Sequence, residues 1–289
     1  MTTEEKNDQH FQSLAHPFVK NIYGSYKGRL RLALLRDDLF PAVDAGKTLL
    51  DVGAGLAQLS GELRLRGVDA YALDAAAEMR EQAESFALDQ SALPWQERYC
   101  VMPLQDYCLP SVHADGYDWV LCHAVLAWLR APAQALLRLG KWVRPGGCLS
   151  ILFYNRDSMA LQQIFRGRYG YLEKMWARTT ATGGQMSTDC SQPLGLSEPF
   201  YPGGLTPQTP LSLAWVTDQL TGMGFRIQLQ RGVRCFADYM HAEVRERLTE
   251  EQLLSIERSY RAQMPFLAMA RYIHVIAKKP TIAKKSIVE

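Results

Sequence analysis

The sequence has no paired cysteines, no long apolar run and no strong net charge. Its six cysteines form no Cys-x-x-Cys pair, so the spacing typical of structural zinc sites and redox motifs is missing. No stretch approaches the roughly 18 apolar residues of a membrane-spanning helix, and the polar N-terminus does not resemble a secretory signal. We therefore expect a cytoplasmic protein with no metal and no membrane attachment. Since the formal net charge is only +2, any nucleic-acid surface must come from local clusters of cations.

A short apolar run followed by a glycine-rich turn organises the chain. Thr48–Val52 has the length and apolar continuity of a strand buried on both faces of a parallel sheet. Gly53 and Gly55 follow it, and two glycines spaced by one residue let the backbone turn tightly and approach a ligand. A helix predicted to begin near Ala57 would direct its free amide groups toward that ligand. Asp74 ends the next apolar run, where an acid can bind a ribose diol.

The residues around this turn argue against two common ligands, weakening the case for a dinucleotide and rejecting a P-loop. A dinucleotide fingerprint has a third glycine three residues after the second, but position 58 is Gln. A phosphate-binding P-loop has a lysine followed by Ser or Thr, whereas residues 57–60 read Ala-Gln-Leu-Ser. What remains is an acid near the end of each of the first two strands, Asp51 and Asp74.

Helical and extended patterns alternate after the turn. This alternation predicts an α/β protein with a mostly parallel sheet. Residues 179–209 are rich in Gly, Ser, Thr and Pro without periodicity, so we expect a long mobile loop there. The predicted strands are 98–102, 117–125, 148–154, 225–230 and 271–277, and the predicted helices are 75–89, one from Pro132, 211–223 and 242–264.

The two acids and the glycine turn resemble the class I S-adenosylmethionine (SAM)-dependent methyltransferases. In that superfamily the first strand ends D/E-x-G-x-G-x-G and the second ends in a ribose-binding acid. Ala57 stands in place of the third glycine, which is the mildest replacement at a helix-packing position. The resemblance implies SAM as the cofactor. It also implies a doubly wound, Rossmann-like, seven-stranded sheet with an N-terminal helical flap and a long loop insertion.

Five other segments of the sequence are distinctive. They are N-I-Y-G-S-Y-K-G-R-L-R at 21–31, C-H-A-V-L-A-W at 122–128, F-Y-N at 153–155, G-V-R-C-F-A-D-Y at 232–239 and R-Y-I-H-V at 271–275. These segments resemble one family within this superfamily, the bacterial tRNA 5-carboxymethoxyuridine methyltransferases. The family resemblance implies one methyltransferase domain over 1–289: an N-terminal flap and helix (1–45), a cofactor-binding half (46–155) and a substrate-side half (156–289). The sequence departs from the family at Leu56-Ala57, where an acid and a glycine are usual, and in the long 179–209 loop.

The resemblance also implies a function. The protein would methylate the side-chain carboxylate of 5-carboxymethoxyuridine at the tRNA wobble position, and its partner would be the anticodon loop. A carboxylate is already ionised near pH 7, so it needs no general base to attack the methyl of a sulfonium. Catalysis would come from holding the reacting atoms in line. We therefore predict no catalytic side chain in the acid–base sense.

Specific residues are predicted for each ligand. Arg31 can clamp the carboxylate of SAM with two parallel hydrogen bonds, and His123 lies where open α/β sheets bind ligands, although a satisfied core histidine is the alternative. The predicted cofactor residues are Arg31, Asp51, Gly53, Ala54, Gly55, Asp74, Leu104, Gln105 and His123. The predicted substrate residues are Tyr23, Lys27, Arg234 and Arg271, with either of the last two meeting the substrate carboxylate.

Two other functions remain open from the sequence. The basic and aromatic segments 18–31 and 156–178 suit phosphates and unstacked bases, but ordinary surface residues have the same composition. In that case the enzyme would methylate a small-molecule carboxylic acid. A catalytically silent scaffold is the third possibility, and the intact acids Asp51 and Asp74 argue against it.

Overall fold

The strands within the described part of the chain form one seven-stranded sheet in the order β3-β2-β1-β4-β5-β7-β6. The computed structural model describes residues 25–89, 93–168, 170 and 209–281. β1 to β5 pair in parallel, whereas β7 is antiparallel to both of its neighbours. The predicted doubly wound, mostly parallel sheet is therefore confirmed. The strands are β1 Thr48–Val52, β2 Asp69–Asp74, β3 Tyr99–Val101, β4 Tyr117–His123, β5 Val143–Tyr154, β6 Arg226–Val233 and β7 Tyr272–Lys278.

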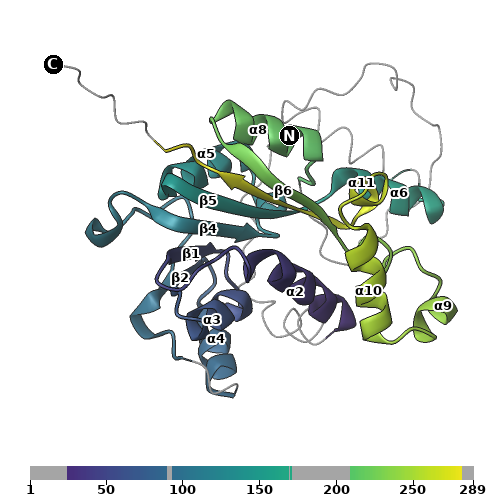
Figure 1. Cartoon of the computed structure of the whole chain (residues 1–289), viewed down its shortest axis with the longest axis horizontal. Coiled ribbons are helices and arrows are strands. Elements are labelled where there is room, and N and C mark those ends of the chain that lie inside the picture. Colours follow the sequence, from purple (N-terminus) through teal and green to yellow (C-terminus); the bar gives the residue numbers. More distant parts are fainter. Residues whose placement is uncertain (1–24, 90–92, 169, 171–208, 282–289) are drawn as a thin grey trace, which may run out of the picture.

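Helices cover both faces of the sheet (Figure 1). α5 and α8 lie on one face, and α2, α3 and α4 lie on the other, with α10 beside α2. Within the described ranges, no helix has the length and apolarity needed to cross a membrane. The helices are α2 Tyr26–Leu39, α3 Gln58–Leu65, α4 Ala77–Asp89, α5 Pro132–Trp142, α6 Arg156–Phe165, α8 Leu213–Gly222, α9 Ala242–Glu246, α10 Glu250–Tyr260 and α11 Phe266–Met269.

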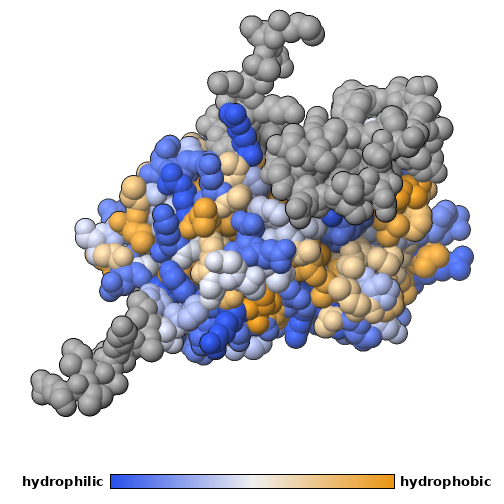
Figure 2. Space-filling model, turned by 90° about the horizontal axis from the view of Figure 1, so that it is seen from above, coloured by the Kyte–Doolittle hydropathy of each residue, from blue (hydrophilic) through white to orange (hydrophobic). Residues whose placement is uncertain are grey.

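The surface is mixed in character. On the face shown in Figure 2, hydrophilic and hydrophobic residues are interspersed over the described part of the chain. Such a mixture is normal because folded proteins still expose much apolar area. On this face, hydropathy alone therefore does not mark out a binding surface.

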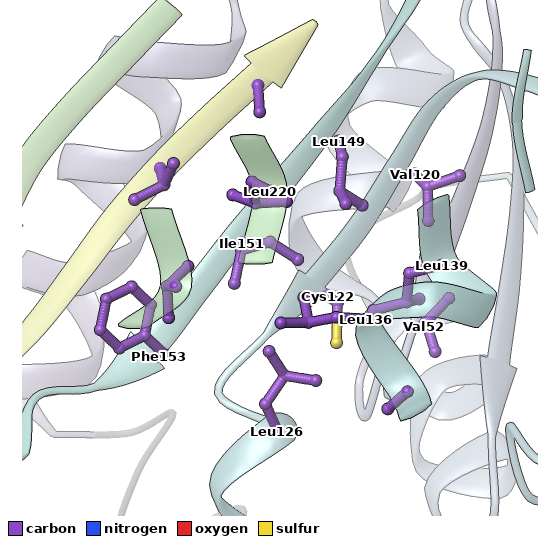
Figure 3. Close-up of a cluster of buried hydrophobic side chains, with 14 of the residues drawn as sticks. Val52, Val120, Cys122, Leu126, Leu136, Leu139, Leu149, Ile151, Phe153 and Leu220 are labelled. Carbon is purple, nitrogen blue, oxygen red and sulfur yellow. The ribbon is translucent and has the colours of Figure 1, made fainter. Parts of the chain in front are cut away.

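The core consists of two layers, one on each side of the sheet. Successive side chains of a strand point to opposite faces, so Val120 and Cys122 pack toward α5 and α8, whereas Trp119 and Leu121 pack toward α2 and α3. Figure 3 shows the first layer, in which Val120 and Cys122 lie with side chains of β5, α5 and α8. Because both faces are covered, the central strands read as continuous apolar runs.

One predicted helix was wrong. The predicted 242–264 helix is two helices, since Thr249 accepts the amide of Gln252 while the Gln252 side chain accepts the amide of Thr249. This capping box starts a new helix at Glu250. At the N-terminus, α2 begins at Tyr26 within 1–45, the segment predicted to contain the flap and a helix, and the Ser25 hydroxyl accepts the Gly28 amide.

The fifth strand is longer than predicted, and two predicted features cannot be located. β5 begins at Val143, which pairs with Tyr117, and an irregularity in register follows before the regular pairing from Cys148. Residues 144–147, which precede the predicted strand 148–154, belong to β5 as well. Tyr23 and nearly all of the predicted 179–209 loop lie outside the described residues.

Candidate cofactor and substrate site

The glycine turn follows β1 in a conformation that requires glycine. Gly53 has φ +69°, and its amide donates to the Leu73 carbonyl at 2.7 Å. A Cβ at Gly53 would lie 2.1 Å from Val125 Cγ2, so no larger residue fits without displacement. Ala57, where the resemblance expects a third glycine, has φ +51°. That position favours glycine for its left-handed backbone as well as for helix packing.

The backbone orients the Asp74 carboxylate over this turn. One oxygen accepts the Gly55 amide at 2.9 Å, and the other accepts the Ala76 amide at 3.0 Å. The interaction fixes the acid at the end of β2 against the turn after β1. The end of β2 and the turn after β1 are therefore in direct contact.

Asp51 lies beneath the turn rather than in the wall of the pocket. Its side chain is buried, and Ser60 donates a hydrogen bond to it at 2.7 Å. Burial raises the pKa of Asp51 to about 6; the Ser60 hydrogen bond opposes this rise, and the charge of Asp74 adds to it. Its predicted contact with the cofactor stays a prediction.

A pocket opens beside the carboxyl ends of β1, β2 and β4, where the direction of chain progression reverses and open α/β sheets bind ligands. Most of the predicted cofactor residues line it, but Ala54 and Asp51 do not. The apolar wall residues, such as Met79 and Trp128, were missed because an apolar side chain carries no chemical signal in a sequence. The lining residues are Arg31, Val52, Gly53, Gly55, Leu73, Asp74, Ala75, Met79, Met102, Pro103, Leu104, Gln105, His123, Ala124, Val125, Trp128 and Leu129.

Two tyrosines and three arginines gather next to this pocket. The rings of Tyr154 and Tyr272 lie 4.6 Å apart on the paired strands β5 and β7. The guanidinium carbons of Arg31 and Arg234 lie 6.0 and 5.4 Å from the Tyr272 ring centre, and that of Arg271 lies 5.4 Å from the Tyr154 ring centre. We refer to these five residues as the Tyr–Arg cluster. It joins the pocket through Arg31.

The Tyr–Arg cluster stabilises negative charge on Tyr272. Burial would raise the pKa of Tyr272, but Arg234, Arg31, Arg271 and the hydrogen bond with Tyr154 lower it below its usual value, whereas burial and the charge of Tyr272 raise the pKa of Tyr154. The effect is notable because a fully buried phenol normally resists ionisation. An anion entering this region would experience the same positive potential.

The predicted substrate cations differ in their partners. Arg234 pairs with Asp238 through two of its nitrogens, and Lys27 pairs with the same carboxylate at 2.9 Å. The Arg271 guanidinium contacts the Gln162 side-chain oxygen at 3.3 Å, and it has no carboxylate partner among the described residues. Arg234 also has φ +63°, an uncommon conformation for a bulky residue that is often found at functional sites.

Similarity to known proteins agrees with this arrangement. A family model described as a methyltransferase domain matches residues 50–151. The tRNA 5-carboxymethoxyuridine methyltransferase of Escherichia coli K12 is 31% identical over 281 residues, which cover 94% of this chain and 97% of the relative. A ubiquinone biosynthesis O-methyltransferase of Aeromonas salmonicida is 32% identical, but over only 47% of this chain and 54% of the relative.

A solved structure shares the fold. Magnesium protoporphyrin IX methyltransferase from Synechocystis PCC 6803, with bound SAM, has a TM-score of 0.53 and 14% identity, covering 96% of this chain and 100% of that one. The sheet, the glycine turn and the matched domain define the chain as a class I SAM-dependent methyltransferase, with SAM as its cofactor. Within that class, its similarity over nearly the full length places it in the family of tRNA 5-carboxymethoxyuridine methyltransferases.

Proposed function

We propose that the protein transfers the methyl group of SAM to the carboxylate of 5-carboxymethoxyuridine at the wobble position of tRNA, forming a methyl ester. The observation that carries this proposal is the 31% identity to a tRNA 5-carboxymethoxyuridine methyltransferase across 94% of the chain. The positive potential of the Tyr–Arg cluster supports it, since a carboxylate substrate needs such a place.

The pocket residues fit the chemical groups of SAM. The Asp74 carboxylate suits the ribose diol, and the Arg31 guanidinium suits the carboxylate of the methionine moiety. Leu104 and Met79 offer apolar surface to the adenine ring, and Gln105 offers a polar group at its edge. When bound, SAM supplies an electrophilic methyl group on a sulfonium.

The substrate carboxylate is assigned to the Tyr–Arg cluster. Arg271 is the first candidate, because Arg234 already shares Asp238 with Lys27. A guanidinium held by Gln162 and the Tyr154 ring would keep its fork turned toward the substrate and give up little conformational freedom on binding. Lys27 would contribute charge to the tRNA surface around this point.

The residues act by position rather than by proton transfer. The carboxylate is ionised at neutral pH and attacks without a base. Buried Trp128 and Tyr154, whose rings lie 5.8 Å apart, would offer apolar surface beside the reacting groups and keep water from them. A fixed alignment of carboxylate, methyl and sulfur is then the main source of acceleration.

A labelled-methyl assay tests the proposal. Radiolabelled methyl from SAM should enter tRNA isolated from a strain that lacks this gene, and mild alkali should release the label, because a methyl ester is base-labile. Matched tRNA lacking the carboxymethoxy precursor should accept no label. Label that resists alkali, or that enters both tRNA samples equally, would indicate transfer to a base or ribose atom. Transfer to small carboxylic acids but not to tRNA would favour the small-molecule alternative.

A further inference from the structure

A continuous chain of hydrogen bonds links α2 to the pocket through the sheet. Asp38 Oδ2 lies 2.7 Å from His274 Nδ1, His274 Nε2 lies 2.8 Å from Ser150 Oγ, and Ser150 Oγ lies 2.9 Å from His123 Nε2. The first three residues are buried, and His123 lines the pocket. The chain therefore crosses from a helix through β7 and β5 to the end of β4 without reaching solvent before the pocket.

The proton positions at the inner end of this chain are determined by Asp38. Burial would raise the pKa of Asp38, but the hydrogen bond to His274 and the charges around it lower it, so the side chain is a carboxylate. A carboxylate only accepts, so His274 donates from Nδ1. Burial keeps the pKa of His274 below its usual value, so this residue is neutral and its Nε2 carries no proton. The Ser150 hydroxyl must then donate to His274.

The outer end follows from the single proton of Ser150. Since that proton points to His274, the Ser150 oxygen can only accept from His123, and His123 must carry its proton on Nε2. The reverse tautomer would set two lone pairs against each other at 2.9 Å. Burial, His274 and Arg31 lower the pKa of His123 well below its usual value, so the ring is neutral and Nδ1 is bare.

The bare nitrogen faces the pocket. His123 Nδ1 has no hydrogen-bond partner among the described residues. It is also absent from the set of fully buried polar atoms without a partner, so this nitrogen is accessible rather than enclosed. Because His123 lines the pocket, the exposed nitrogen opens into it. The pocket wall thus offers a hydrogen-bond acceptor beside the Arg31 guanidinium, which offers donors.

We infer that Asp38, His274 and Ser150 are positioning residues that hold His123 in the Nε2–H tautomer, so that Nδ1 accepts a hydrogen bond from the ammonium group of the cofactor's methionine moiety. The inference rests on the proposed placement of SAM in the pocket. Arg31 and His123 then recognise the two opposite charges of one amino-acid group. The pair is selective for a zwitterionic group, so a nucleoside without that group gains no affinity from the hydrogen-bond chain.

Nitrogen NMR of the ligand-free protein tests the tautomer. Two-bond proton–nitrogen correlations, with His123 assigned through His123→Gln, should show Nε2 protonated in the wild type. Ser150→Ala should convert His123 to a mixture or to the Nδ1–H form, because a buried N–H without an acceptor is costly. Ser158→Ala is the matched control: Ser158 is equally buried but bonds Tyr239 instead. A wild-type His123 already in the Nδ1–H form, or a shift in both variants, would overturn the inference.

Calorimetry with two ligands tests the contact. S-adenosylhomocysteine carries the ammonium group, whereas methylthioadenosine lacks the whole amino-acid moiety. Ser150→Ala should weaken the affinity for S-adenosylhomocysteine by about three- to tenfold, the usual contribution of one hydrogen bond. The affinity for methylthioadenosine should stay unchanged. Equal weakening of both ligands, or of neither, would overturn the inference.

Two controls keep the result interpretable. Should Ser150→Ala unfold in a thermal scan, Ser150→Cys keeps the size with a weaker acceptor, and its affinity for S-adenosylhomocysteine should still fall below that of the wild type. An unchanged affinity of Ser150→Cys for S-adenosylhomocysteine would count against the proposed role of the hydrogen-bond chain. If the wild type binds no S-adenosylhomocysteine, the proposed cofactor placement itself fails. Normal wild-type binding that is insensitive to Ser150 rejects only this inference.

Discussion

At the scale of single residues, Asp51 is a buried carboxyl group beneath the turn after β1, and its ionisation destabilises the folded state. Its pKa in the folded protein is about 6, whereas an unfolded aspartate titrates near 3.9. The folded state thus retains a proton that the unfolded state loses as the pH rises from about 4 to about 6. Stability should therefore decrease over that window and stay level above it.

Asp51→Asn should remove this dependence. The variant should match the wild type near pH 4 and become more stable by up to about 3 kcal/mol at pH 7, because an amide pays no ionisation cost. Urea unfolding at a series of pH values measures the difference. Asp115→Asn, at an exposed position, is the control and should follow the wild-type profile. A constant difference between Asp51→Asn and wild type at all pH values would contradict the buried-charge explanation.

Arg271 tests which cation meets the substrate. Arg271→Gln should lower kcat/KM for tRNA methylation by about 10- to 100-fold, as expected for a lost charged hydrogen bond, and leave the affinity for S-adenosylhomocysteine unchanged. Arg271→Lys should recover only part of the activity, because lysine lacks the planar fork. Arg226→Gln, on the exposed side of β6, should behave like the wild type. If cofactor affinity falls together with activity, Arg271 does not act on the substrate.

The sequence indicated polar residues that line the pocket better than it indicated the partners of the surface cations. Asp74 and His123 line the pocket and could be located because polar residues at strand ends of a parallel sheet have few structural reasons to be there, whereas Gln105, which also lines it, was implied by the family resemblance. The pairing of Lys27 with Asp238 and of Arg29 with Glu250 could not be predicted, since those partners are more than 200 residues apart. Only the tertiary structure shows that these cations are already engaged.

At the scale of elements, the break between α9 and α10 depends on one side chain. Thr249→Ala removes the capping hydrogen bond to the Gln252 amide and should destabilise the protein by about 1 kcal/mol. Ser259→Ala, within α10, is the control: its hydroxyl only bonds the carbonyl of the preceding turn, and alanine favours helix there. Urea unfolding of both variants measures the costs. Equal costs would show that the cap does not start α10.

The central strands were predictable and several element boundaries were not. Thr48–Val52 and the fourth strand were recognised because burial on both faces gives an uninterrupted apolar run. The 242–264 segment was predicted as one helix because its charges are distributed evenly, and the capping signal within it consists of only two side chains, Thr249 and Gln252. Capping is decided by local hydrogen bonds that compete with helix continuation.

At the scale of the whole molecule, topology brings distant segments to one place. β1 and β4 lie side by side in the centre of the sheet, so the turn after β1 and His123 face the same pocket. β7 inserts between β5 and β6, which places Tyr272 beside Tyr154 and positions Arg271. The sequence indicated the order of elements, but the Tyr–Arg cluster depends on this insertion and had no local pattern that could reveal it.

The central claim is that the protein esterifies the wobble nucleoside, and mass spectrometry of tRNA nucleosides tests it most directly. Bulk tRNA from a strain lacking this gene should contain 5-carboxymethoxyuridine as the free acid and none of its methyl ester. The wild-type gene should restore the ester, whereas a gene carrying Asp74→Ala should not, because Asp74 is proposed to hold the cofactor's ribose. Isolation must avoid alkali, which would hydrolyse the ester in every sample. An unchanged amount of methyl ester in the deletion strain would contradict the account.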